Sequence, residues 1–181
     1  MRGEDRRRHH RAAGGALQAL LAAAVAALSL RFDCLAIEGP AGTLRAEIPL
    51  GLAGARGSSF VLSFMHSVAK LPVAEYFRPR GGEIQLYKTV YKGLGAGLPF
   101  GDEGGRVSLV DGSIVIDGLD RRFQSITVSP SSFTENRLEV GGRRYDLYAL
   151  VGGGGIATLR ISRRPVGEVI FRGQTAKGVL Q

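Results

Sequence analysis

The stretch that predicts the fold is residues 60–91, FVLSFMHSVAKLPVAEYFRPRGGEIQLYKTVY. Phe60, Leu62 and Phe64 alternate with other residues at its start, and a period of two is typical of a strand with one buried face. Gly81-Gly82 separates two later runs, and paired glycines accept the positive φ angles that a tight hairpin turn needs. The stretch therefore predicts consecutive antiparallel strands joined by short turns.

The same signals recur towards the C-terminus. Asp111-Gly112 and Gly141-Gly142 each separate two alternating apolar runs, which indicates two more hairpins. Leu159 and Ile161 continue the alternation after the glycines at 152–155. We therefore expect a mainly β domain of eight to ten short, mostly antiparallel strands, arranged as a sandwich or a partly closed barrel.

The N-terminal residues differ in composition from the rest of the chain. Residues 1–11 form a basic tip, and residues 12–30, AAGGALQALLAAAVAALSL, carry no charge. As a helix, the second segment reaches about 28 Å at roughly 1.5 Å per residue, close to the thickness of the hydrocarbon core of a bilayer. We therefore expect one N-terminal hydrophobic helix ahead of a single β-rich domain at residues 31–181.

The asymmetry of charge around the hydrophobic segment predicts where that domain lies. The positive-inside rule places the arginine-rich tip in the cytoplasm and residues 31–181 outside it. Two alternatives remain for residues 12–30. The segment is either an uncleaved anchor in the cytoplasmic membrane, which its length favours, or a signal peptide cleaved near Ala24-Val25-Ala26. In the second case the domain is secreted to the periplasm.

The polar composition argues against several classes of function. The net charge is +8, of which +3 lies in the tip as five arginines against Glu4 and Asp5, and the remainder is too dispersed for a dedicated nucleic-acid binder. Cys34 is the only cysteine, which excludes an internal disulfide and suits a core position in the first strand. His66 is the only histidine outside the tip, so a typical transition-metal site is not expected. We expect no metal and no cofactor.

The first hairpin carries the polar side chains of greatest interest. A four-residue loop at residues 69–72 places His66 opposite Glu75, and a two-residue turn at Gly81-Gly82 then places Glu75 opposite Lys88. The predicted result is a polar row, His66–Glu75–Lys88, across three strands. The row is either part of a binding site or a structural device that sets strand register, because paired polar groups tolerate partial burial.

A glycine-rich segment follows the third strand, Tyr91-Lys92-Gly93-Leu94-Gly95-Ala96-Gly97-Leu98-Pro99-Phe100. Exposed backbone N–H groups in such a loop can hold an anion, and Lys92 would assist. The alternative is a tight structural loop. It is not a phosphate-binding loop of the P-loop type, because the Gly-Lys-Ser/Thr ending and the following helix are missing.

Two linked motifs in this region carry a resemblance. They are His66-Ser67-x-x-Lys70-x-Pro72-Val73-x-Glu75-Tyr76 and Tyr91-x-x-x-Gly95-Ala96-Gly97-x-Pro99. Together they resemble the DUF1850 family, small bacterial proteins encoded beside TAXI-type TRAP (tripartite ATP-independent periplasmic) solute transporters. The resemblance implies an extracytoplasmic accessory domain. The candidate residues for ligand or partner binding are His66, Ser67, Lys70, Glu75, Lys88, Tyr91, Lys92, Gly95, Ala96, Gly97 and Pro99.

Three functions are compatible with these residues. The first is a binding or assembly module that docks on the membrane subunits or the solute-binding protein of the transporter. The second is a periplasmic binder of a small organic acid through Lys70, Lys88 and Lys92. The third is a serine hydrolase, because Ser67-x-x-Lys70 has the spacing of a serine–lysine pair.

The hydrolase is the least favoured of the three. A serine–lysine pair at this spacing works when both residues share a helix face, whereas Pro72 and the strand alternation predict a turn. We therefore expect no catalytic residues and no enzymatic activity.

Overall fold

The computed structural model describes residues 30–52, 59–93 and 104–165, together with Gln18. The helix predicted for residues 12–30 lies outside this part of the chain, apart from Gln18 and Leu30. Among the described residues, no helix has the length and apolar character needed to cross a membrane.

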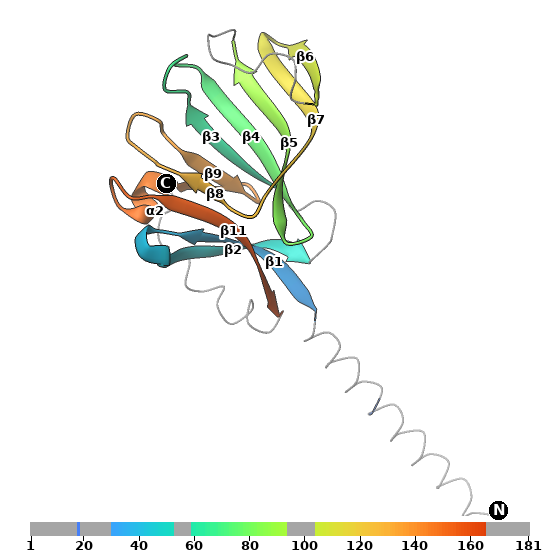
Figure 1. Ribbon diagram of the computed structural model, residues 1–181, viewed down its shortest axis with the longest axis vertical. Helices are drawn as coiled ribbons and strands as arrows, with labels where there is room; N and C mark the ends of the chain where they lie inside the picture. The colour runs from blue at the N-terminus through green and yellow to red at the C-terminus, as the bar shows by residue number, and fades with distance from the viewer. Residues whose placement is uncertain (1–17, 19–29, 53–58, 94–103, 166–181) are drawn as a thin grey trace, which may run out of the picture.

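The described chain forms two antiparallel sheets (Figure 1). The smaller sheet has the order β2 (Leu44–Leu52), β1 (Arg31–Glu38), β11 (Ala157–Pro165), β8 (Ile126–Val128). The larger sheet has the order β10 (Arg143–Asp146), β9 (Arg137–Val140), β3 (Phe60–Met65), β4 (Pro72–Arg80), β5 (Glu83–Lys92), β7 (Ser113–Phe123), β6 (Arg106–Val110). Two short helices, η1 (Pro40–Gly42) and α2 (Leu147–Val151), lie in connections.

The mainly β prediction is confirmed, and two of its details change. The sheets are not closed into a barrel, so of the two predicted arrangements only the sandwich is compatible with the structure. The described residues contain eleven strands, one more than the expected maximum. The three-residue β8 is too short to show an alternating pattern, which explains why the sequence does not indicate it.

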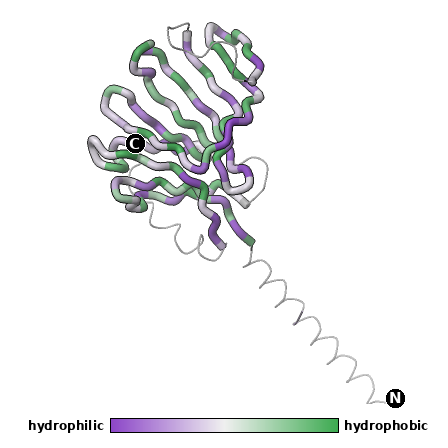
Figure 2. The backbone as a smooth tube through the Cα atoms, in the orientation of Figure 1, coloured by the Kyte–Doolittle hydropathy of each residue, from purple (hydrophilic) through white to green (hydrophobic). Residues whose placement is uncertain are grey.

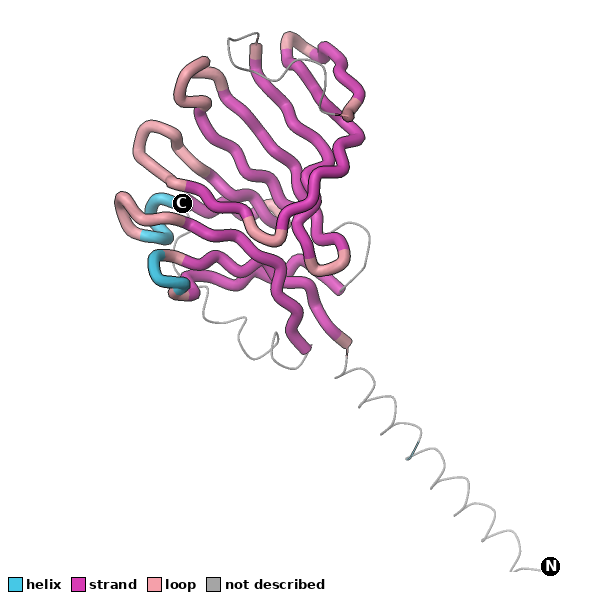
Figure 3. The backbone as a smooth tube through the Cα atoms, in the orientation of Figure 1, coloured by secondary structure: helices cyan, strands magenta, loops and turns pink. Residues whose placement is uncertain are grey.

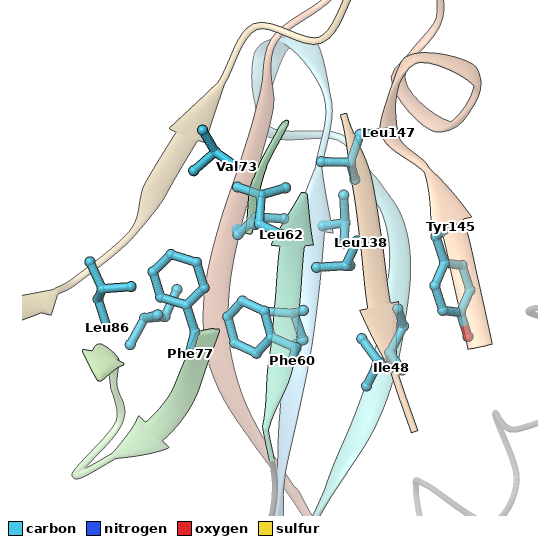
Figure 4. Close-up of a cluster of buried hydrophobic side chains, with 14 of the residues drawn as sticks. Ile48, Phe60, Leu62, Val73, Phe77, Leu86, Leu138, Tyr145 and Leu147 are labelled. Carbon is cyan, nitrogen blue, oxygen red and sulfur yellow. The ribbon is translucent and has the colours of Figure 1, made fainter. Parts of the chain in front are cut away.

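One hydrophobic core joins the two sheets (Figure 4). Phe60 on β3 and Phe77 on β4 stack with ring centroids 5.2 Å apart and an interplanar angle of 20°. Leu35 and Leu159 reach the same cluster from the smaller sheet, and both are fully buried. Cys34 on β1 is 1% exposed, which confirms its predicted place in the core of the first strand.

The three predicted two-residue turns are confirmed. Val110 pairs with Ser113 across Asp111-Gly112, and the φ angles of the two turn residues are 48° and 72°. Gly81-Gly82 and Gly141-Gly142 have positive φ angles as well. Two consecutive left-handed residues match the right-handed twist of the flanking strands, so each pair joins its strands directly.

The predicted register of the β3–β4 hairpin is wrong. Met65 pairs with Pro72 and Leu62 pairs with Glu75, so the loop runs from His66 to Leu71 and is longer than the four residues expected. His66 therefore belongs to the loop and is not a strand partner of Glu75. Backbone hydrogen bonds within the loop, described below, stabilise this longer form.

The predicted pairing of Glu75 with Lys88 is also wrong. Phe77 pairs with Leu86, as a two-residue turn at Gly81-Gly82 requires, but Tyr76 pairs with Lys88 and Glu75 with Thr89. An extra residue, Tyr87, is inserted in β5 and shifts the register by one. A β-bulge of this kind places two residues opposite one and moves every later side chain to the other face. The row His66–Glu75–Lys88 therefore does not form.

Candidate functional site

The loop between β3 and β4 is held by its own backbone and by His66. The His66 N–H donates to the Leu71 carbonyl at 2.9 Å, and the Lys70 N–H donates to the His66 carbonyl at 2.9 Å. The Ala69 N–H donates to Nδ1 of His66 at 3.1 Å. Lys70 adopts a left-handed backbone with φ 52°. The side chain of His66 thus shapes the loop, in the way that an N-cap side chain closes a helical turn.

The conformation of this loop leaves its outermost side chains exposed. Ser67 and Lys70 are exposed, and Val68 is 74% exposed. Residues 67–70 form a turn, so Ser67 and Lys70 do not lie on one face of a helix. Pro72 begins β4, where the strand needs no N–H from its first residue.

A second loop is attached to the first. The Met65 N–H at the end of β3 donates to the Thr134 carbonyl at 2.8 Å, so the β8–β9 loop lies beside the β3–β4 loop. Both loops lie on the same edge of the molecule (Figure 3, left). The Thr134 N–H donates to Oγ of Ser131, and the Ser131 N–H donates to Oγ1 of Thr134, each at 3.1 Å. This turn presents Phe133, which is 87% exposed.

The structure separates Glu75 from Lys88. Glu75 lies two residues from the buried Val73 and two from the buried Phe77, and because strand side chains alternate it points to the same core side of the sheet. Its cross-strand neighbour Thr89 is 1% exposed. Lys88 follows the bulge and points to the opposite side of the sheet. The two residues therefore cannot belong to one site.

Lys88 instead joins an aromatic cluster on the side of the large sheet that faces away from the core. Its Nζ lies 4.6 Å from the ring centroid of Tyr76, and Cζ of Arg78 lies 5.0 Å from the ring centroid of Tyr87. The two tyrosine rings meet edge to face with centroids 6.3 Å apart. Cation–π contacts of this kind contribute about 0.5–1 kcal/mol at exposed sites. No sequence pattern groups Tyr76, Arg78 and Tyr87, because it is the bulge that brings Tyr87 onto this side.

Hydrogen bonds extend the cluster to β7. Nε of Arg78 donates to Oε1 of Gln85 at 2.8 Å, and Nε2 of Gln85 donates to Oδ1 of Asp120 at 2.6 Å. Asp120 also accepts from Nε of Arg122 at 3.2 Å, and this hydrogen bond holds the pKa of Asp120 below its usual value. Gln85 is only 2% exposed, so it connects the strands from a fixed position.

The remaining candidate residues lie at or beyond the end of β5. Tyr91 is buried in the core, and Lys92 is exposed. A Cβ atom added to Gly93 would lie 3.4 Å from Cδ2 of Leu71, so the end of β5 packs against the β3–β4 loop. Gly95, Ala96, Gly97 and Pro99 lie outside the described residues.

The comparison with known families concerns the same hairpins. Residues 60–147 match the family model described as a domain of unknown function, DUF1850. This confirms the predicted family for that segment. The DUF1850 segment runs from the first residue of β3 to the first residue of α2, and it contains both exposed loops and the aromatic cluster. No curated protein and no solved structure matches the chain.

Proposed function

We propose that this protein is an extracytoplasmic docking domain that serves a solute transporter of the TAXI-type TRAP class. The N-terminal hydrophobic segment holds it at the cytoplasmic membrane, or exports it to the periplasm if that segment is cleaved. The domain contacts the membrane subunits or the solute-binding protein through a tip surface, defined as residues 66–71 and 129–136. The resemblance of residues 60–100 to transporter-associated proteins supports the choice of partner.

The observation that carries the proposal is the way in which the tip surface is built. The hydrogen bonds of His66 are used to hold the β3–β4 loop in one conformation. That conformation exposes Val68 beside a second loop that exposes Phe133. Apolar side chains presented on pre-ordered loops lose little conformational entropy on binding, which favours recognition of a protein surface.

The same geometry weighs against the hydrolase alternative. Nδ1 of His66 accepts a hydrogen bond from the Ala69 N–H, and so it is not directed at Ser67 as a general base. Ser67 and Lys70 lie in a turn, whereas a serine–lysine pair requires a shared helix face. Docking therefore explains the Ser67-x-x-Lys70 motif without a general base, whereas catalysis would require one.

Binding of a small organic acid is the alternative that one observation favours. Gly93 lies against the side chain of Leu71, and the exposed residues Lys92 and Lys70 are the chain neighbours of these two residues. Two cations close together can attract a carboxylate. The glycine segment that would complete such a site, residues 94–100, lies outside the described residues.

Affinity purification of the tagged full chain from membranes of its host cells tests the docking proposal. We expect transporter subunits to co-purify with the unaltered chain. Replacing two exposed apolar side chains, Val68→Ser with Phe133→Ser, should reduce their recovery by about tenfold, as expected for the loss of interface anchors worth more than 1 kcal/mol.

The matched control is Leu109→Ser, which removes a 71% exposed side chain from β6, outside the tip surface. It should leave recovery unchanged. The proposal is wrong if no transporter subunit co-purifies with the unaltered chain. It is also wrong if the variant of the tip surface and the Leu109→Ser control reduce the recovery of subunits equally. Retention of a bound organic acid by the purified chain without any subunit would favour the alternative.

A further inference from the structure

A second surface lies on the large sheet, on the side opposite the core. We call this side the outer face and restrict it to β4, β5, β7 and β6. Ala74 pairs with Val90, and Val90 pairs with Val115, so the three form a row across the sheet. Val90 and Val115 each lie between two buried residues of their own strand, and therefore point outward. Ala74 follows the buried Val73 and pairs with Val90, so it lies on the same side. Figure 2 shows hydrophobic and hydrophilic residues interspersed along these strands, as two faces of different polarity require. The centre of the outer face is thus apolar, and its side chains are small.

Aromatic and basic side chains border this row on one side. Tyr76 pairs with Lys88, and Lys88 pairs with Asp117, which forms a neighbouring row. The bulge at Tyr87 adds a second tyrosine and brings Arg78 over its ring. An apolar centre next to tyrosine and arginine has the composition of a protein–protein interface.

The border is ordered before any partner binds. Arg78 is held between the Tyr87 ring and the buried amide of Gln85, and Lys88 is held over the Tyr76 ring. Side chains that are fixed in advance lose less entropy on binding than mobile ones, by about 0.5–1.5 kcal/mol each. The arrangement is therefore suited to holding a partner's polar groups in defined positions.

Charge indicates the chemistry of the partner. The outer face carries more cations than carboxylates. The cations are Arg78, Arg80, Lys88, Lys92, Arg106 and Arg122, and the carboxylates are Glu83, Asp117 and Asp120. Asp120 is occupied by Arg122 and Gln85, which leaves the cations in excess. A partner with acidic side chains complements this surface.

We propose that the outer face binds an acidic protein segment. Apolar side chains of that segment cover Ala74, Val90 and Val115, and its carboxylates pair with Lys88 and Arg78. A lipid surface fits less well, because none of the apolar residues in the central row is exposed enough to insert between head groups. A nucleic acid fits less well because Asp117 lies next to Lys88 within the surface. The proposal is independent of the tip surface.

Site-directed photo-crosslinking of the full chain in its host cells tests this surface. A benzophenone amino acid at position 76 should crosslink to a protein, and the crosslinked peptide should be rich in Asp and Glu. Combining it with Lys88→Glu and Arg78→Glu should reduce the yield by about tenfold, because the rim then repels carboxylates. The same crosslinker at Tyr148, which is 37% exposed on α2, should not capture that protein.

Arg45→Glu with Arg143→Glu is the matched control, because it makes the same change in net charge on β2 and β10. It should leave the crosslink unchanged. Lys88→Glu alone tests the surface if the double variant does not fold, since it leaves the Arg78–Gln85 hydrogen bond in place. A lipid adduct, a crosslinked peptide without acidic residues, or an equal loss in the control would each overturn the proposal.

The tip variant separates this result from the docking proposal. Val68→Ser with Phe133→Ser should leave the crosslink at position 76 unchanged. If the crosslink fails while transporter subunits are recovered normally, only the proposal for the outer face is refuted. If the crosslink forms but no transporter subunit is recovered, only the docking proposal for the tip surface is refuted.

Discussion

Cys34 shows how strongly the core changes the chemistry of a single residue. Its thiol lies on β1 with 1% exposure, and burial raises its pKa to about 11, with a further contribution from the negative charge of Glu47. A thiolate at this position would have no water to solvate it. The sulfur therefore stays protonated and packs as a small apolar group.

The raised pKa of Cys34 predicts a loss of stability in alkali. As pH rises above about 9, the thiol ionises in the unfolded chain but stays protonated in the folded one until about pH 11, so the unfolded state is favoured. Urea unfolding followed by circular dichroism should show a decrease of about 2 kcal/mol between about pH 8 and about pH 10.5 from this group.

Cys34→Ala is the control for this titration, because other groups that ionise in the same range are kept. The variant is expected to be less stable at about pH 8, since a small cavity replaces the sulfur. Its stability should then fall less with pH than that of the unaltered chain. Equal falls in the two proteins would show that the Cys34 thiol is not the group responsible.

The β3–β4 loop shows how local hydrogen bonds change the length of an element. Strand alternation predicts that His66 extends β3 and meets Glu75, whereas the structure ends β3 at Met65. The loop gains a hydrogen bond from the His66 N–H to the Leu71 carbonyl. It also gains those from the N–H groups of Lys70 and Ala69 to the carbonyl and Nδ1 of His66. Those bonds satisfy backbone groups that a shorter loop would leave to solvent.

The role of His66 in this loop predicts a difference between two substitutions. His66→Ala removes the acceptor for the Ala69 N–H and should lower the free energy of unfolding by about 1 kcal/mol, as the loss of a capping side chain does. His66→Asn should recover most of this, because the Asn side-chain oxygen can accept the same hydrogen bond. Urea unfolding of the three proteins measures the difference. Equal destabilisation by Ala and Asn would contradict this role.

The β-bulge in β5 could not be predicted from the sequence of that strand. Nothing in Glu83–Lys92 marks Tyr87 as an inserted residue, since no glycine or proline interrupts the strand. The bulge arises where β5 pairs with β4 on one side and with β7 on the other, and both registers shift near it. The position of the bulge therefore depends on the pairing of β5 with both β4 and β7. The hydrophobic pattern of β5 alone holds no information about that pairing.

In the molecule as a whole, one hydrophobic core holds the two sheets together. Phe77 is 2% exposed and stacks on Phe60 at the centre of the large sheet, whereas Phe133 is 87% exposed on the tip surface. The two phenylalanines therefore have different roles. The first stabilises the fold, and the second is available for contact with a partner.

This difference predicts opposite results for two alanine substitutions. Phe77→Ala should lower the free energy of unfolding by about 3–5 kcal/mol, because it leaves a cavity between the sheets. Phe133→Ala should change it by no more than about 0.5 kcal/mol. Urea unfolding measures both, and Phe77→Leu replaces Phe77→Ala if the latter does not fold. A large loss of stability in Phe133→Ala would mean that this residue supports the fold.

The β class, three of the turns and the core position of Cys34 could all be predicted from the amino-acid sequence. These features depend on residues that are near one another in the chain, such as an alternating run or a pair of residues that accepts positive φ. The family resemblance also rests on local motifs in residues 60–100, and residues 60–147 match the same family.

Which side chains meet depends on the packing of distant segments and could not be predicted from the sequence. The length of the β3–β4 loop separated His66 from Glu75, and the bulge at Tyr87 moved Lys88 to the face of Tyr76. The hydrogen bond from Met65 to Thr134 placed the β8–β9 loop, which carries Phe133, beside the β3–β4 loop, which carries Val68. Each of these outcomes follows from hydrogen bonds and packing between distant segments. In a sheet, a one-residue change in register reverses the face of every side chain that follows.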